Sequence, residues 1–535
     1  MRDTLNYMMR LFAVVVCCGV VATSCGEPER EEILKIYNWG DYIDEDLLEE
    51  FEVWYEQQTG CKVKIIYQTF DINEVMLAKI EKGEADFDVV CPSEYIIERM
   101  MRHNLLQPIV DEEFIADLES TDTENYLGCV SPYIRGQFDH IITPEPGLNA
   151  NDYSVGYMWG TTGILFNTEY VSAEEAESWD LMFDERLEGK ILVKDAFRDV
   201  YSPMLVYAKT LELREAGILA EDETLPLNVA MAQERGLEGV VPTIEELMYD
   251  ASDESIALVE EYMKRMKRLV AGWEADFGKE MMTQNKAWIN LMWSGDAVWA
   301  IEEAAEVDVS LDYVVPEEGS VVWFDGWVIP KYAKNPRAAR YFINYMCMPE
   351  NAVRNMDATG YVSVVATEEV LRAMDPMLAA MDELYAAMDE ATAEEDVAAI
   401  VEELHALEAE RDALLVEEGV DLSYFFKDAE GNPLTFDMGD GYMVHADCVY
   451  VDPIMYPDMS VIDRCAMMHD SGEQTEKMLE MWSRVKGDNL SPWMLGFIII
   501  SFVLIIVWYV WRKVDAYRKQ QKMLKRRHHA RKQQK

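Results

Sequence analysis

Tryptophan, tyrosine and aspartate recur together in six short motifs along the first two-thirds of the chain. The faces of Trp and Tyr rings attract cations by about 0.5 to 2 kcal/mol, and they also cover methylene groups at roughly 0.8 kcal/mol each. A carboxylate in a closed site supplies the charge that an ammonium group needs. These residue types together favour a binding site for an organic cation. The motifs are Tyr37–Tyr42, Asp88–Tyr95, Tyr157–Gly163, Met292–Asp296, Trp323–Asp325 and Thr359–Tyr361.

The six motifs, in this order, resemble those of the periplasmic spermidine/putrescine-binding proteins of bacterial polyamine ABC importers. The resemblance covers roughly residues 33–365, with a weaker match at Ser460–Lys486. It implies an α/β, two-lobed periplasmic-binding-protein fold of type II, in which crossing segments join the lobes and a hinge closes them over the ligand. The ligand class that it implies is a polyamine, putrescine or spermidine.

The resemblance also implies roles for individual residues. Asp325 would bind an ammonium group of the ligand, and Ser93 and Asp41 would add polar contacts. Each aromatic side chain could instead pack in the core, which is the ordinary role of an isolated Trp. The implied aromatic box consists of Trp39, Tyr42, Tyr95, Trp293, Trp323 and Tyr361.

One motif departs from the family. Where its members have Asp-Asp-Ala-Arg-Glu, with the second Asp and the Glu on the ligand, this chain has Asp195-Ala196-Phe197-Arg198-Asp199. Asp199 can replace the Glu with a shorter reach, but Ala196 stands where the second Asp is expected. Asp195 could take its place only if the loop shifts by one residue. The loss of one carboxylate favours a diamine such as putrescine over a triamine.

The elements that must position these residues begin as strands alternating with helices. The pattern predicts strands at Ile33–Trp39, Lys62–Tyr67 and Phe87–Cys91, and helices at Asp44–Gln58, with Gly60 as its stop, and at Ile72–Lys82. Such alternation is typical of a parallel sheet covered on both faces, with ligands bound beyond the strand ends.

The domain organisation that we expect is discontinuous. Residues 33–157 with 324–365 form lobe 1, and residues 158–323 with 450–486 form lobe 2. Residues 368–449 form an acidic helical insertion that begins with two antiparallel helices, and 212–253 looks like a second addition. The Met and Leu stripe of the acidic insertion is typical of an ordinary packing face.

Charge divides the chain into an acidic body and a basic tail. The chain carries 47 basic and 101 acidic residues, a net charge of -54, which disfavours nucleic acid as a partner.

Pro492–Trp511 holds twenty uncharged residues, enough for a transmembrane helix, and the basic run 512–535 after it should stay cytoplasmic. The alternative is a buried core helix.

The N-terminus, residues 1–25, is typical of an export signal. Arg2 and Arg10 precede the apolar run Leu11–Ala22, and Thr23-Ser24-Cys25-Gly26 resembles a lipoprotein signal in which Cys25 is acylated. An ordinary cleaved signal peptide is the alternative. Either way, we expect the acidic body at the periplasmic face of the cytoplasmic membrane, anchored there by lipid, by the C-terminal helix or by both.

Other functional classes have weaker support. The chain lacks the phosphate-binding loop, the His-Glu-x-x-His motif and the Gly-x-Ser-x-Gly motif, so we expect no enzyme, no cofactor and no metal. A membrane-anchored polyamine sensor or scaffold is the alternative to a transport role with ABC permease and ATPase partners. Anion, sugar or iron binding on the same fold is disfavoured because the motifs supply aromatic rings and acids instead of Arg or clustered metal ligands.

Overall fold

The computed structural model describes residues 29–487, apart from 84, 85, 146, 276, 392, 393, 429 and 440, together with 500, 501, 508, 509 and 511–513. The chain divides into two compact units, residues 1–475 and 476–535, and the first contains all candidate binding residues. Within the described part, no helix is long and apolar enough to cross a membrane. The expected signal with Cys25, most of the expected span 492–511 and most of the basic tail lie outside the described residues.

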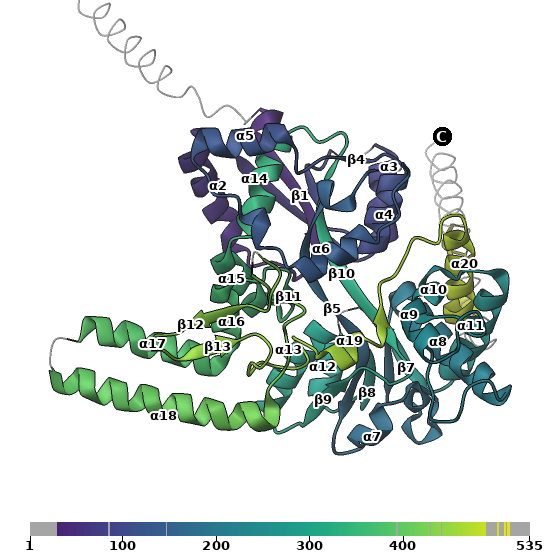
Figure 1. Cartoon of the computed structure of the whole chain (residues 1–535). Helices are drawn as coiled ribbons and strands as arrows, with labels where there is room; N and C mark the ends of the chain where they lie inside the picture. The colour runs from purple at the N-terminus through teal and green to yellow at the C-terminus, as the bar shows by residue number, and fades with distance from the viewer. Residues whose placement is uncertain are drawn as a thin grey trace, which may run out of the picture. The chain divides into compact units, whose positions relative to one another are not determined.

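Two long strands, β5 (Ser154–Asn167) and β10 (Ser320–Pro330), organise the main sheet of the first unit. Both are buried along their whole length. They pair antiparallel from Thr161 opposite Val322 to Ser154 opposite Val328. The strands of the sheet follow the order β2-β1-β3-β10-β5-β8-β6-β7, so β5 and β10 lie at its centre (Figure 1).

Each end of this central pair carries its own set of neighbours. Towards its C-terminal end β10 pairs with β3, which continues the sheet to β1 and β2. The C-terminal half of β5 pairs with β8 and β9, and the sheet continues from β8 to β6 and β7. This arrangement fits a two-lobed fold in which β5 and β10 cross from one lobe to the other. The strands not yet delimited are β1 Ile33–Trp39, β2 Lys64–Phe70, β3 Val89–Val90, β4 Leu106–Gln107, β6 Ile191–Lys194, β7 Val270–Glu274, β8 Ile289–Trp293, β9 Leu311–Val314, β11 Val362–Ser363 and β14 Cys465–Ala466.

The sheet is mixed, which corrects the prediction of a parallel one. Pairing is parallel among β1, β2 and β3 and among β6, β7 and β8, as expected. It is antiparallel wherever β5 or β10 takes part with β3, β8 or each other. Local alternation of strands and helices does not reveal these crossing strands, because they pair segments more than 150 residues apart in the chain.

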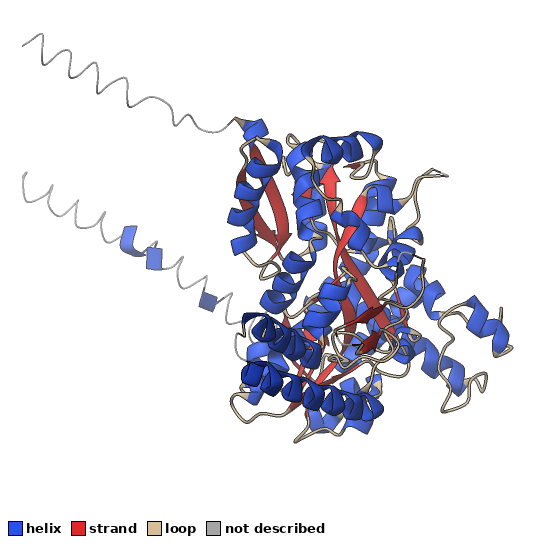
Figure 2. Ribbon diagram, turned by 60° about the vertical axis from the view of Figure 1, so that its left-hand side comes forward, coloured by secondary structure: helices blue, strands red, loops and turns tan. Residues whose placement is uncertain are grey.

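Helices cover the sheet on both sides, as the blue and red elements of Figure 2 show. The first predicted helix is confirmed as α2, and Gly60 ends it in the left-handed region at φ 69°. The second predicted helix is confirmed as α3. The helices of the first unit and the helix that follows it are α2 Asp46–Thr59, α3 Asn73–Glu81, α4 Glu94–Arg102, α5 Glu112–Thr121, α6 Pro132–Asp139, α7 Ala173–Ala176, α8 Phe197–Glu215, α9 Val229–Glu234, α10 Ile244–Tyr249, α11 Asp253–Met266, α12 Gly278–Thr283, α13 Ser294–Ala305, α14 Pro336–Met346, α15 Pro349–Thr359, α16 Glu368–Met374, α17 Pro376–Glu390, α18 Glu394–Glu418, α19 Met459–Ile462 and α20 Gln474–Gly487.

The expected acidic helices are α17 and α18, which lie side by side (Figures 1 and 2). A short helix, α16, precedes them, and a small hairpin of β12 (Thr435–Asp437) and β13 (Met443–His445) follows. A buried ion pair fixes the base of the helices, since the Arg411 guanidinium donates to Asp375 Oδ2 at 2.8 and 3.0 Å.

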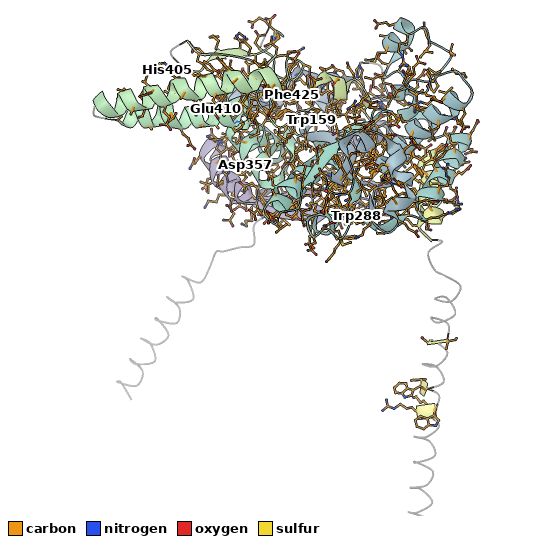
Figure 3. The ribbon with its side chains drawn as sticks, turned by 90° about the horizontal axis from the view of Figure 1, so that it is seen from below. Trp159, Trp288, Asp357, His405, Glu410 and Phe425 are labelled. Atoms are coloured by element: carbon orange, nitrogen blue, oxygen red, sulfur yellow. The ribbon has the colours of Figure 1, made fainter. Side chains whose placement is uncertain are left out.

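The segment after α18 packs on the central strands. The ring of Phe425 stacks on Trp159 of β5 with centroids 5.4 Å apart, and Trp159 stacks on Phe324 of β10 at 6.2 Å. Figure 3 places Phe425 next to Trp159 at the base of the helical pair, with His405 and Glu410 further along α18. The hydroxyl of Ser131 also donates to the Phe425 carbonyl at 2.7 Å. The insertion is therefore joined to the strands that cross between the lobes.

We expect Gly163→Ala to destabilise the protein by about 1–3 kcal/mol, because a Cβ at Gly163 would lie 2.4 Å from the Val314 carbonyl oxygen of the paired strand. The free energy of unfolding in urea measures the effect. Gly136→Ala in α6 is the matched control, since a Cβ there meets nothing within 4 Å and alanine favours a helix interior. Equal stability of the two variants would contradict the close approach of β5 and β9.

Candidate functional site

The candidate residues come from strand ends and from the middle of β10. Trp39 ends β1, Asp195 follows β6, and Trp293 ends β8, whereas Trp323 and Asp325 lie in β10 itself. Residues that follow parallel strands meet at one edge of a sheet, where ligands of α/β folds bind. The candidate residues at the strand ends thus come from both halves of the sheet and lie near the crossing of β5 and β10.

Asp325 is the centre of the first group. It is 6% exposed and lies where the pairing of β10 with β5 shifts register between Asp325 and Gly326. The Tyr42 hydroxyl donates to its Oδ2 at 2.9 Å, and the Ser93 hydroxyl donates to its Oδ1 at 2.6 Å. Burial raises the pKa of Asp325 to about 7, although both hydrogen bonds lower it.

Ser93 connects Asp325 to the start of α4. It occupies the N-cap position of that helix, but its oxygen accepts from the Asn73 amide and from no backbone N–H of the helix, while its hydroxyl proton is donated to Asp325. The Asn73 amide donates to both the Ser93 hydroxyl and the Tyr95 hydroxyl at 2.9 Å. Ser93, Tyr95 and Asp325 therefore form one hydrogen-bonded network.

Aromatic rings enclose this network. The ring of Tyr361 packs edge-to-face against Tyr42 at 5.1 Å and against Trp323 at 5.6 Å. Tyr42 packs edge-to-face against Tyr157 at 5.5 Å. Tyr42, Trp323 and Tyr361 thus form a continuous wall beside Asp325, which is the arrangement that a methylene chain with an ammonium group requires.

Asp199 is the second buried carboxylate. It lies in the first turn of α8, and the Trp293 indole N–H donates to its Oδ1 at 3.0 Å. Burial raises the pKa of Asp199 to about 6. The charge of Asp199 also raises the pKa of Asp325, so the two carboxylates act on each other electrostatically.

Two predicted residues, Trp39 and Asp41, are not joined to these groups by the contacts described. The ring of Trp39 packs on Phe70 at 4.5 Å, and its indole N–H is buried without an acceptor among the described residues. Asp41 is exposed and has a positive φ of 49°. Asp195 is half-buried, and its backbone N–H donates to the Glu274 carbonyl at 2.7 Å. Their place in the site stays a prediction.

Other residues at the site were not predicted. The Arg198 guanidinium lies 4.4 Å over the ring of Tyr95 and 3.6 Å from Glu74 Oε1, so it links α8 to α3 and α4. Glu94 is fully buried and accepts from the Phe324 N–H at 3.0 Å, and burial raises its pKa well above the ordinary value. Glu94 and Arg198 lie inside motifs that the sequence singled out, whereas no pattern in the sequence marks Asn73 or Glu74.

Two of these side chains keep acceptor oxygens without a donor. Asn73 Oδ1 and Glu94 Oε1 are buried and make no hydrogen bond among the described residues, whereas Glu74 Oε1 is ion-paired with Arg198 at 3.6 Å. A buried acceptor without a partner is costly, so a group with several N–H donors is favoured beside them. Within the described residues, no cluster of three or more His, Cys, Asp or Glu is arranged to hold a metal ion.

Comparison with known proteins identifies consistent relatives. Residues 48–380 match the family model described as bacterial extracellular solute-binding protein. The spermidine/putrescine-binding periplasmic protein of Escherichia coli (strain K12) is 25% identical over 339 residues, which cover 63% of this chain and 79% of that protein. The putrescine-binding periplasmic protein PotF of the same organism is 28% identical over 362 residues, which cover 65% and 82%.

Solved structures agree on the fold. A chain provisionally described as a spermidine/putrescine ABC transporter from Listeria monocytogenes aligns with a TM-score of 0.54 at 25% identity, covering 85% of this chain and 99% of that chain. The Tp0655 (TpPotD) lipoprotein of Treponema pallidum aligns with a TM-score of 0.52 at 17% identity, covering 85% and 99%, which supports the fold alone.

We expect the stabilising effect of Asp325→Asn to grow as the pH rises from 4 to 8. The folded protein holds a proton on Asp325 up to about pH 7, whereas the unfolded chain releases it near pH 3.8, so the native carboxyl loses stability across this window. Asparagine keeps the shape without the charge. Its advantage in the free energy of unfolding at pH 8 should be on the order of a few kcal/mol.

Urea denaturation of the ligand-free protein at pH 4.5, 6 and 8 measures this difference. Glu221→Gln is the control, because Glu221 is exposed in a turn. Its replacement should change the urea midpoint of unfolding little at each of the three pH values. A difference between Asp325→Asn and the parent that stays constant with pH would contradict the perturbed ionisation of Asp325.

Proposed function

The chain belongs to the bacterial extracellular solute-binding protein family, and from this premise we propose that it captures a polyamine, putrescine or spermidine, for an ABC importer. The names of its relatives support this assignment, since they include binding proteins for spermidine, putrescine and cadaverine. The proposed role is binding and delivery, without catalysis.

The pair of buried carboxylates is the observation that carries the proposal. Asp325 and Asp199 receive hydrogen bonds from neutral donors, namely Tyr42, Ser93 and Trp293. Two buried negative charges that raise each other's cost of ionisation are neutralised by one molecule with two ammonium groups. A polyamine supplies these groups and a methylene chain for the surrounding rings.

The two carboxylates also suggest how binding couples to closure. Asp325 lies on the crossing strand β10, and Asp199 lies on α8, which follows β6 of the other half of the sheet. A diamine that reaches both would tie the two halves together. Closure over the ligand would exclude water and strengthen both charge pairs.

The residues that we assign to the ligand come from both halves of the sheet. Trp39, Asp41 and Asp195 are included on the resemblance of their motifs. The remaining assignments rest also on the contacts described above. They are Tyr42, Ser93, Tyr95, Asp199, Trp293, Trp323, Asp325 and Tyr361.

The proposed location is the outer face of the bacterial cytoplasmic membrane, in agreement with an extracytoplasmic family. Membrane attachment through Cys25 or through residues 492–511 rests on the sequence alone, as does a cytoplasmic tail at 512–535. An ABC permease and its ATPase are the proposed partners.

We expect Asp325→Asn to weaken putrescine binding at least thirty-fold. The substitution removes the charge that faces a buried ammonium, and a charge-assisted hydrogen bond in a closed site contributes on the order of 2 to 4 kcal/mol. Isothermal calorimetry at pH 8, where Asp325 is ionised, measures the affinity. Glu221→Gln should bind like the parent. A change of less than threefold in Asp325→Asn would remove Asp325 from the site.

A diamine should bind at least as tightly as a triamine, because Ala196 leaves one end of the site without a carboxylate. Ala196 is the N-cap of α8 and makes no capping hydrogen bond. We therefore expect Ala196→Asp to raise the affinity for spermidine relative to putrescine, because the new carboxylate adds roughly one charged contact to the third ammonium.

The control for this substitution is Ala196→Asn, because Asp and Asn cap a helix about equally and only Asp adds charge. Both variants should gain stability, and Ala196→Asp alone should shift the preference. A tenfold preference of the parent for spermidine in competition binding would contradict the inference from Ala196 and leave the family unchanged.

A further inference from the structure

Lys194, the last residue of β6, is a fully buried lysine beside the proposed site. Its ammonium lies 2.6 Å from Asp296 Oδ2, 3.3 Å from Glu274 Oε1 and 3.0 Å from the Ala275 carbonyl oxygen. The same nitrogen lies 4.4 Å over the ring of Trp293. Two carboxylates and an indole face thus surround one ammonium group.

The charged form of this lysine is maintained by its neighbours. Burial lowers the pKa of Lys194, but Asp296 and Glu274 raise it by more, so the net direction is upward. Asp296 also lies 3.4 Å from Lys279 Nζ, and Tyr361 hydrogen-bonds to it. Glu274 is held by the Gly278 N–H and the Asn290 amide, each at 3.0 Å. The carboxylates are fixed in place around the ammonium.

Trp293 joins this cluster to the proposed ligand site. Its indole N–H binds Asp199, while its ring face contacts the Lys194 ammonium. Lys194 also lowers the pKa of Asp199, which places its charge within electrostatic reach of that carboxylate. The environment of the Lys194 ammonium is chemically the one that a polyamine needs, namely carboxylates and an aromatic face.

A purely structural role explains this cluster poorly. Replacing a buried ion pair by apolar residues of similar volume is often neutral or stabilising, so ion pairing alone is a weak reason to bury a lysine here. We propose that Lys194 is a resident ammonium group that fills a cation position next to Trp293 and thereby limits the ligand to a diamine anchored at Asp325 and Asp199. This inference rests on the proposed polyamine binding and adds to it a residue that determines ligand length and charge.

The charges of the site follow from this assignment. Asp296 and Glu274 are paired with Lys194, Asp296 is also paired with Lys279, and Glu74 lies near Arg198. The carboxyl groups held by neutral donors are Asp325, Asp199 and Glu94, and burial raises the pKa of Glu94 well above its ordinary value, which favours its neutral form. A third ammonium beside Trp293 would therefore enter a place where Lys194 and Lys279 already match the charges of Asp296 and Glu274, and its desolvation would go uncompensated.

The test is Lys194→Ala in the full-length protein, which removes the ammonium from Glu274 and the Trp293 face and leaves Asp296 with Lys279. We expect a lower melting temperature that millimolar n-propylammonium chloride raises again, and a spermidine-to-putrescine affinity ratio at least tenfold above that of the parent. Thermal denaturation and competition calorimetry measure the two effects. Tetramethylammonium chloride at equal concentration controls for ionic strength, because it cannot donate hydrogen bonds.

Lys190→Ala is the matched control variant. Lys190 lies four residues earlier, and its ammonium is 4.8 Å over the ring of Trp288, a residue that Figure 3 labels, but it donates to the Lys286 carbonyl instead of two carboxylates. Removing it should bring neither rescue by n-propylammonium nor a change in the affinity ratio. If Lys194→Ala does not fold, Lys194→Ala/Glu274→Gln, with one buried charge fewer, takes its place with the same measurements.

The inference is overturned if n-propylammonium stabilises the Lys194 and Lys190 variants equally and the affinity ratio changes less than twofold. If the parent protein still binds putrescine in that case, only the inference about Lys194 fails and the proposed function is retained. A parent that binds no polyamine would overturn the proposed function, and selective rescue by n-propylammonium would still decide whether the position of Lys194 accepts a free ammonium.

Discussion

The antiparallel pairing of β5 and β10 is the constraint on which the rest of the structure depends. Both strands are buried over their whole length and pair with each other across the junction of the two halves of the sheet. Side chains alternate between the faces of a strand, so Trp323 and Asp325 point away from the side on which Phe324 stacks with Trp159. One face of the pair therefore carries the site, and the other carries the aromatic contact with the insertion.

The site combines burial with charge, which ordinary packing avoids. Asp325, Asp199 and Glu94 are buried, and burial raises the pKa of each. The surrounding hydroxyl, indole and amide donors hold the carboxyl groups in place without neutralising them. Under the proposed function, such a site is unfavourable when empty and favourable when a cation enters, and this difference would give the protein its affinity.

The sequence motifs predicted a group of residues that the structure brings together, because each motif keeps its aromatic and polar residues close in the sequence. Six residues of these motifs lie together in the structure, as we expected, namely Tyr42, Ser93, Tyr95, Trp323, Asp325 and Tyr361. Asn73 and Glu74 were missed because they sit at the start of a helix with no distinctive neighbours in sequence. Lys194 was missed because a lysine at a strand end usually faces solvent, and only the tertiary structure brings Asp296 and Glu274 around it. The mixed sheet was missed for the same reason, since pairing between remote segments leaves no local periodicity.

The position of β10 in the sheet has a consequence for the order of folding. β10 lies between β3 and β5, so a strand of residues 320–330 completes a sheet begun by residues 33–90. During synthesis, some 230 further residues must be added after β3 before β10, its partner in the sheet, has been made. Closing the long loop between β3 and β10 is entropically slow. The edge of β3 that pairs with β10 stays open during that interval. The main sheet can therefore be completed only after its central strand has been made.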